Sequence, residues 1–141
     1  MAVTIRLLIL LSLLANNYTV ANDREAQVNY MLNCQGCHTP DGQGSPDKGV
    51  PTLKNFMGKF LTVKGGREFL IQVPGASQST LNSSQLAQMT NWMLKTFDPA
   101  SINQDFKPYS AEEVAMLRKV KLIKVSETRK RLLKKIEAAS H

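Results

Sequence analysis

Residues 34–38 read Cys-Gln-Gly-Cys-His, and the rest of the chain is interpreted outward from this stretch. Two thiols three positions apart, followed directly by an imidazole, form the attachment signature of a c-type haem. Each thiol adds to a haem vinyl group as a thioether, the separation of the two vinyls sets the spacing, and the adjacent imidazole binds the iron. The motif therefore predicts that Cys34 and Cys37 bind haem c covalently and that His38 is the metal ligand.

Other interpretations of the two cysteines fit the sequence less well. A Cys-x-x-Cys pair in an exported protein is also found as a redox-active or structural disulfide. A thioredoxin-like site would follow a strand within a βαβ pattern, and no strand-rich segment precedes Cys34. A zinc site would need four ligands, and the chain offers only two Cys, His38 and the terminal His141.

The first 21 residues have the features of a secretory signal peptide. Arg6 supplies a positive start, the apolar run 7–15 is too short to span a bilayer as a stable helix, and residues 19–21 are small residues typical of a cleavage site. We expect cleavage after Ala21 and a periplasmic protein, with an uncleaved membrane anchor as the alternative. Later apolar runs are shorter, so no transmembrane segment is expected.

The remaining sequence predicts a small all-α fold. Ala26, Tyr30 and Cys34 recur every four residues, which indicates a helix that leads into the motif. Further helices are expected, joined by loops rich in Gly, Pro, Asp and Ser at 39–52 and 74–80. These helices are predicted over 53–61, over 67–73, and from Ser83 or Ser84 to Phe97, where Asp98-Pro99 stops the last one.

Residues 22–97 resemble a class I c-type cytochrome, because a helix ending in Cys-x-x-Cys-His is followed by a Pro-x-Leu segment and a final aromatic-bearing helix. The resemblance implies a cytochrome c fold around one covalent haem. It implies that the Pro51 carbonyl accepts the imidazole N–H of His38, which fixes the ring and raises its basicity. It also implies that Leu53 packs on the haem face.

The same resemblance implies that Trp92, on the last helix, packs against the first helix near Tyr30. One feature departs from the family. The distal Met usually lies in the loop before the last helix, and here that loop, 74–82, contains no Met. The sixth iron ligand is left open between Met57, Met89 or Met93, and no Met at all, with the iron open or bound weakly by the Ser77-Gln78 loop.

The predicted function is that of an exported mono-haem cytochrome, a one-electron carrier in electron transport and not an enzyme. No catalytic acid, base or nucleophile constellation is visible in the sequence. The expected partners are larger redox proteins, an exported dehydrogenase or a terminal oxidase with an acidic docking surface. We expect no nucleic-acid binding and at most peripheral membrane association. The alternative is a haem-based binder or sensor of a gas or peroxide, with an open distal iron position.

Residues 98–141 form a predicted basic, helical C-terminal extension of the 22–97 domain. The formal charge of the chain is +7, of which residues 22–97 contribute +2 and residues 98–141 contribute +4. A helix is expected over 111–119 with Ser110 as its cap, and another after Ser126, while the aromatic stretch 106–109 is placed to lie back on the domain. The basic helix suits an acidic partner, although a solvated amphipathic helix is the favoured interpretation.

Overall fold

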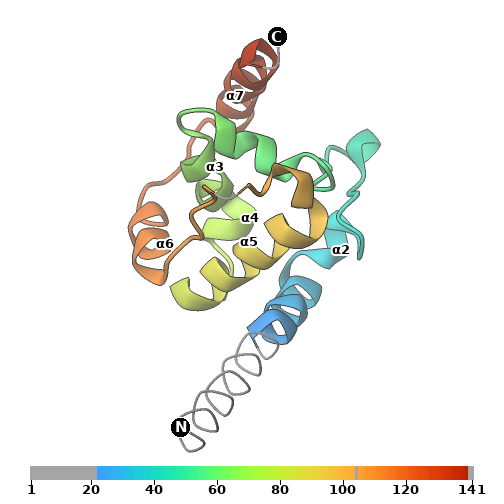
Figure 1. Cartoon of the computed structure of the whole chain (residues 1–141), viewed down its shortest axis with the longest axis vertical. Helices are drawn as coiled ribbons and strands as arrows, with labels where there is room; N and C mark the ends of the chain where they lie inside the picture. Colours follow the sequence, from blue (N-terminus) through green and yellow to red (C-terminus); the bar gives the residue numbers. More distant parts are fainter. Residues whose placement is uncertain (1–21, 104, 140–141) are drawn as a thin grey trace, which may run out of the picture.

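The computed structural model describes residues 22–103 and 105–139, and the predicted signal peptide at 1–21 lies outside them. The described part is helical, with one isolated bridge between Ser45 and Val50, which confirms the predicted all-α class (Figure 1). Within it, no helix has the length and apolar character needed to cross a bilayer. Residues 22–33 are helical, and the elements that follow are α2 Gln35–His38, η1 Pro46–Lys48, η2 Met57–Thr62, α3 Gly66–Gln72, α4 Pro74–Ser77, α5 Ser83–Phe97, η3 Pro99–Ser101, α6 Ala111–Leu117 and α7 Val125–Ala139.

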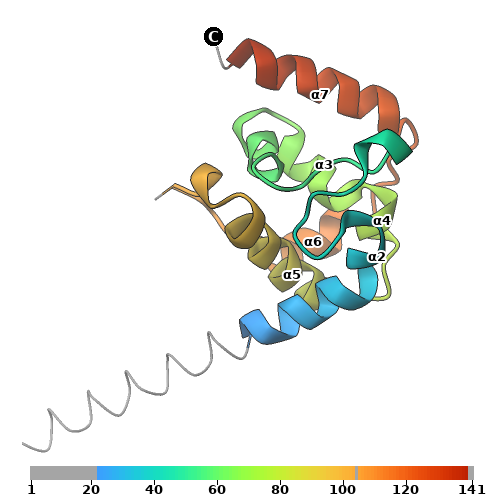
Figure 2. The same ribbon diagram turned by 90° about the vertical axis from the view of Figure 1, so that its right-hand side faces the viewer.

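The helix over 22–33 and α5 pack against each other at one end of the molecule (Figure 2). The ring of Tyr30, only 1% exposed, lies 5.6 Å from the ring of Trp92 and 5.0 Å from that of Phe97. Aromatic pairs at these separations add to the free energy gained from burial alone. The predicted contact between Trp92 and the first helix is therefore confirmed.

The start of α5 differs in detail from the prediction. The cap is Asn82, not Ser83 or Ser84: its side chain accepts a hydrogen bond from the Gln85 backbone N–H at 2.9 Å. The Gln85 side chain accepts in return from the Asn82 N–H at 3.1 Å. This reciprocal pair satisfies two free N–H groups of the first turn, which a serine one position later does not do.

The predicted loop over 74–80 is partly wrong, because its first residues form the short helix α4 with Pro74 at the first position. Proline is favoured there because its fixed φ suits a helix start and its missing N–H needs no partner. The helix predicted over 53–61 is a 3₁₀ helix that starts later, at Met57, while the helix predicted over 67–73 is confirmed as α3.

The C-terminal extension packs onto the rest of the molecule. Ser110 caps α6 as predicted, and Val114 on α6 is fully buried against the core that α5 forms. Helix α7 lies across the end of the molecule opposite the helix over 22–33 (Figures 1 and 2). Its Leu132 and Ile136 are buried against the stacked rings of Phe60 and Phe69. Both helices of the extension therefore share a hydrophobic core with the preceding residues.

The aromatic stretch before α6 lies back on the domain, as predicted. Tyr109 is 4% exposed, and its hydroxyl donates to the Arg67 carbonyl at 2.8 Å. The Asn91 side chain, on α5, accepts from the Tyr109 N–H at 2.8 Å and donates to its carbonyl at 3.0 Å. These bonds satisfy the backbone of an irregular segment on both its donor and its acceptor side.

Candidate functional site

The Cys-x-x-Cys-His stretch continues the first helix through one turn. The Cys34 N–H donates to the Tyr30 carbonyl at 2.9 Å, and the His38 N–H donates to the Cys34 carbonyl at 2.9 Å. Positions i, i+3 and i+4 of a helix lie on one face. This geometry brings Cys34, Cys37 and His38 together, so the two thiols and the imidazole face the same group.

The two cysteines are free thiols, Cys34 half-buried and Cys37 exposed. Burial, together with the nearby Cys37, raises the pKa of the Cys34 thiol to about 11. A dithiol that exchanges disulfides needs the opposite, a thiol whose pKa is lowered so that the thiolate forms. The environment therefore argues against a thioredoxin-like role and leaves both sulfurs available for thioether formation.

The imidazole of His38 is held by one backbone group. Its Nδ1 lies 3.2 Å from the Pro51 carbonyl oxygen. Burial lowers the pKa of His38, and the hydrogen bond to Pro51 offsets this only in part. A neutral ring that donates from Nδ1 keeps its lone pair on Nε2, which is the form that binds a metal.

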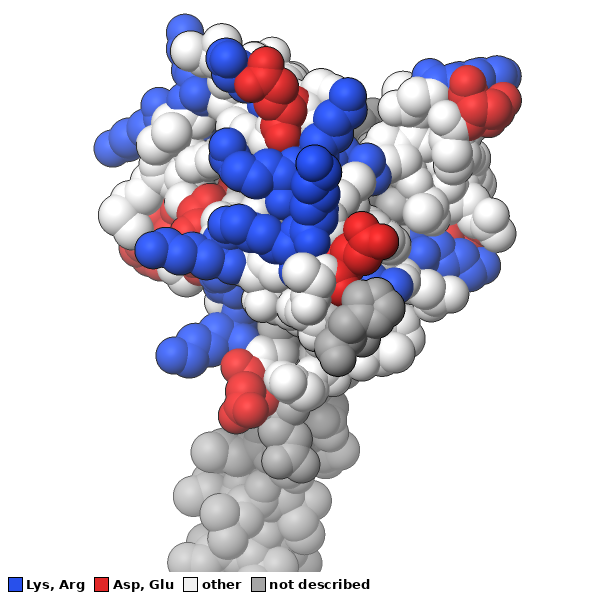
Figure 3. All heavy atoms as spheres, turned by 90° about the horizontal axis from the view of Figure 1, so that it is seen from above, with Lys and Arg blue, Asp and Glu red and all other residues white. Residues whose placement is uncertain are grey.

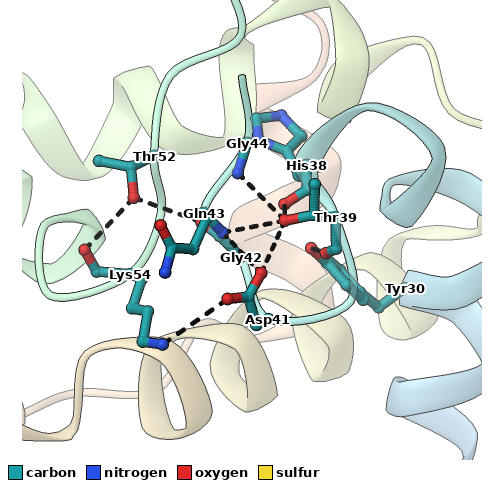
Figure 4. Close-up of polar contacts among 9 residues, drawn as sticks. All are labelled: Tyr30, His38, Thr39, Asp41, Gly42, Gln43, Gly44, Thr52 and Lys54. Carbon is teal, nitrogen blue, oxygen red and sulfur yellow. Dashed lines mark hydrogen bonds and ion pairs between the residues drawn. The ribbon is translucent and has the colours of Figure 1, made fainter. Parts of the chain in front are cut away.

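The loop after the motif is organised by the Thr39 side chain (Figure 4). The Thr39 hydroxyl accepts from the backbone N–H of Gln43 at 3.1 Å and of Gly44 at 3.2 Å, and lies 2.8 Å from an Asp41 carboxylate oxygen. That contact with Thr39 lowers the pKa of Asp41. Asp41 also pairs with Lys54 at 3.7 Å, which joins the two sides of the loop.

Tyr30 connects this loop to the first helix. Its hydroxyl donates to the Thr39 carbonyl at 2.6 Å, and burial raises the pKa of Tyr30 to about 12. Thr39 has a φ of 64°, a conformation that costs energy for a β-branched residue. The Tyr30 hydroxyl is therefore one of the contacts that hold the chain in this turn directly after His38.

Two glycines allow the loop to close on the motif. Gly42 has a φ of +75°, and a Cβ there would lie 2.8 Å from the ring of Phe97; its carbonyl accepts from the Leu53 N–H at 2.8 Å. Gly44 has a φ of +67°, and a Cβ there would lie 2.7 Å from the Pro51 carbonyl oxygen. Only glycine fits both requirements without strain. Sequence reasoning missed these roles, although the Gly-x-Gly spacing directly after the motif was a visible signal.

Comparison with known proteins agrees with this geometry. The family model of cytochrome c matches residues 24–103. The chain belongs to the cytochrome c family. Cytochrome c-552 of Thermus thermophilus is 33% identical over 107 aligned positions, which cover 63% of this chain and 81% of that protein. A cytochrome c-552 from a named strain of the same organism has the same identity over the same length, covering 72% of that protein.

Membership of the cytochrome c family means that the chain carries covalently bound haem c with its iron, as the motif predicted. The residues present fit that group. Two unpaired thiols share a helical face with an imidazole whose Nδ1 is already engaged, so the free donor set is two sulfurs and one Nε2. The resemblance of the sequence to a class I cytochrome is confirmed.

The methionines of this cytochrome lie in the core. Met57, Met89 and Met93 are 4%, 2% and 7% exposed and belong to one hydrophobic cluster. The Met89 sulfur lies 3.9 Å from the Cys34 sulfur. A cysteine thioether is bonded to the rim of a haem, so the Met89 side chain lies beside the point of attachment.

Proposed function

We propose that this protein is an exported mono-haem cytochrome that carries one electron at a time between larger redox proteins. The observation that carries the proposal is the single helical face that presents Cys34, Cys37 and His38, with His38 Nδ1 on the Pro51 carbonyl at 3.2 Å. In this proposal, the two cysteines hold the haem and His38 binds its iron. The haem supplies an iron that alternates between the ferric and ferrous states.

The protein's part in this proposal is to hold and insulate. The Pro51 carbonyl fixes the ring of His38 and raises its basicity, which is a means of tuning a metal site. Leu53, half-buried and packed against the main core, is proposed to cover the haem face. Each reactive group of the motif has a binding role, which leaves the motif no free acid, base or nucleophile. We therefore propose a carrier and not an enzyme.

The basic face of α7 is the proposed docking surface for an acidic redox partner. Residues 121–139 hold seven Lys/Arg against two Asp/Glu, a net charge of +5, and Figure 3 shows this end of the molecule covered by Lys and Arg. The apolar face of α7 is fixed on Phe60 and Phe69, so the charges point outward from a docked helix. Concentrated charge of one sign raises encounter rates with a partner of opposite charge.

A salt titration tests this surface. Replacing the exposed Lys130, Lys134 and Lys135 with Ala should lower the rate of electron transfer from an acidic donor protein by about tenfold at low ionic strength. The difference should shrink as salt is added, because exposed charges are screened beyond about 10 Å at 0.1 M. A triple Ala variant of Lys48, Lys95 and Lys107, which are exposed lysines outside α7, is the matched control. Equal losses in both variants would count against α7 as the docking surface.

Export is the proposed route to the site of haem attachment. It is supported by the signal-like pattern of residues 1–21, and we propose cleavage after Ala21 and a periplasmic location. N-terminal sequencing of the haem-bearing protein tests this proposal. A mature chain starting at Asn22 is expected, and a haem protein that retains Met1 in the membrane fraction would contradict it.

A second candidate function is the binding of a small ligand such as a gas or peroxide at the iron. It is favoured by one observation: the loop before α5, residues 78–82, contains no Met, and Met89 lies beside the sulfur of Cys34. An iron without a strong sixth ligand has a face that small molecules can reach.

Absorption spectra distinguish the carrier from the ligand binder. The purified protein is measured oxidised and reduced, with and without carbon monoxide. A carrier is expected to give a reduced c-type spectrum that carbon monoxide does not alter, with reversible one-electron oxidation. A high-spin reduced spectrum that shifts readily with carbon monoxide would overturn the carrier proposal in favour of the ligand binder.

A further inference from the structure

The loop before α5 is held from outside by one arginine of the C-terminal extension. Arg118, the residue that caps the end of α6, donates from Nε to the Ser77 carbonyl at 3.0 Å. Its Nη1 donates to the Leu81 carbonyl at 2.7 Å, and its Nη2 to the Ser79 carbonyl at 2.8 Å. All three guanidinium nitrogens are used on a single loop, 37 to 41 residues away in sequence.

The same loop lies against the haem attachment segment. The Thr80 hydroxyl donates to the side-chain oxygen of Asn33 at 3.3 Å, and Asn33 directly precedes Cys34. Leu81 is 7% exposed and belongs to the hydrophobic cluster against which Cys34 packs. The loop is therefore a wall of the site, touching the attachment segment on its inner side and Arg118 on its outer side.

We propose that Arg118 is a positioning residue, whose guanidinium fixes the loop 77–81 against the haem attachment segment and thereby sets the coordination and accessibility of the iron. The inference rests on the proposed haem role of Cys34, Cys37 and His38. It gives the C-terminal extension a part in the redox site, in addition to the packing of α6 and α7.

Two physical arguments support the role of this side chain. Residues 78–82 lie outside any helix, so their carbonyls lack the regular partners of secondary structure. A planar guanidinium presents several donors in fixed directions, which a lysine ammonium does not. Removing three charge-assisted hydrogen bonds should raise the population of the locally open loop by at least about tenfold.

The test uses the full haem-loaded protein and the variants Arg118→Ala and Arg118→Lys. The first readout is hydrogen exchange of the backbone amides of residues 78–82. The second is the haem: the absorption spectrum, the rate of carbon monoxide binding to the reduced protein, and the midpoint potential. Glu113→Gln is the matched control, because it breaks the pairing of α6 with Arg67 at 2.6 Å without touching the loop.

For Arg118→Ala we expect loop exchange and carbon monoxide binding each at least about tenfold faster than in the unaltered protein. The lysine variant should resemble the alanine variant, since charge without the fork leaves the carbonyls unmatched. Glu113→Gln should leave both readouts unchanged. If Arg118→Ala does not fold, the lysine variant decides the outcome by the same readouts.

Three results would overturn the proposal. One is unchanged exchange at 78–82, and another is faster exchange with an unaltered spectrum, carbon monoxide rate and potential, which would show a structural role only. The third is an equal response to Glu113→Gln, which would assign the effect to general loosening of α6. A wild-type protein without covalent haem would instead refute the proposed function, so the two failures are distinguishable.

Discussion

The Nδ1 of His38 lies 3.2 Å from the carbonyl oxygen of Pro51, and Gly44 sits directly behind that oxygen. The Gly44 N–H donates to the His38 carbonyl at 2.9 Å, so the same residue contacts the backbone of the histidine and the carbonyl that orients its ring. The loop after the motif therefore returns to its own starting point. Its closure sets the orientation and basicity of the proposed iron ligand.

Replacing Gly44 with Ala should displace the Pro51 carbonyl, because the added Cβ would lie 2.7 Å from its oxygen. A weaker bond to Nδ1 makes the imidazole less basic and favours ferrous iron, so the midpoint potential should rise by on the order of tens of millivolts. Gly49→Ala is the matched control, because Gly49 has a similar φ of +82° and nothing within 4 Å of its Cβ position. Redox titration measures both, and equal potentials in the two variants would count against the role of the Pro51 carbonyl.

Tyr30→Phe removes the hydroxyl that donates to the Thr39 carbonyl at 2.6 Å. We expect the free energy of unfolding to fall by about 1 kcal/mol, since a buried acceptor loses its partner. Tyr109→Phe, which loses a comparable 2.8 Å bond to the Arg67 carbonyl, serves as the control. Urea unfolding should show similar losses in both, but only Tyr30→Phe should alter the haem spectrum. A spectrum that responds equally to both changes would contradict this assignment of Tyr30 to the turn.

The Arg67–Glu113 pair predicts a pH-dependent contribution to stability. Its hydrogen bonds lower the pKa of Glu113 below the ordinary value of 4.5. A lowered folded-state pKa gives stability that is fully present above the unfolded pKa and lost as the pH falls through the folded one. Glu113→Gln should therefore be less stable than the unaltered protein at pH 7, and the difference should vanish below about pH 4. A difference that is the same at pH 7 and pH 3 would show that the pair is not the cause.

Leu132→Ala tests whether α7 is docked in solution. Leu132 is 2% exposed and packs in the cluster with Phe60 and Phe69, so the change should cost about 2–5 kcal/mol of unfolding free energy. Leu133, which is only partly buried, should cost clearly less when changed to Ala. Calorimetry of the two variants decides the matter: equal small losses would mean that α7 does not share the core.

The sequence predicted most of the elements that have strong local signals. The four-residue recurrence of Ala26, Tyr30 and Cys34 indicated the first helix, and Ser110 with Glu113 indicated the start of α6. Where two signals competed, the choice was sometimes wrong. Asn82 won over the serines after it as the cap of α5, because its partner Gln85 lies at the right spacing for a reciprocal pair.

The contacts that shape the site were harder to predict, because they join distant residues. Nothing local distinguishes Arg118 from the other basic residues of the extension, yet it alone makes the three bonds to Ser77, Ser79 and Leu81. Likewise, Leu132 and Ile136 had an evident apolar spacing, but the surface they cover, Phe60 and Phe69, is set by tertiary packing. Periodicity shows which face is buried and leaves its partner open.

Covalent attachment is the central claim, and intact mass with haem staining on a denaturing gel tests it most directly. The protein is produced in a host that matures c-type cytochromes, beside the variants Cys34→Ala, Cys37→Ala and the double variant. The unaltered protein should carry the mass of one haem through denaturation, and the double variant should carry none. An unaltered chain that emerges without haem, or a double variant that keeps it, would contradict the account.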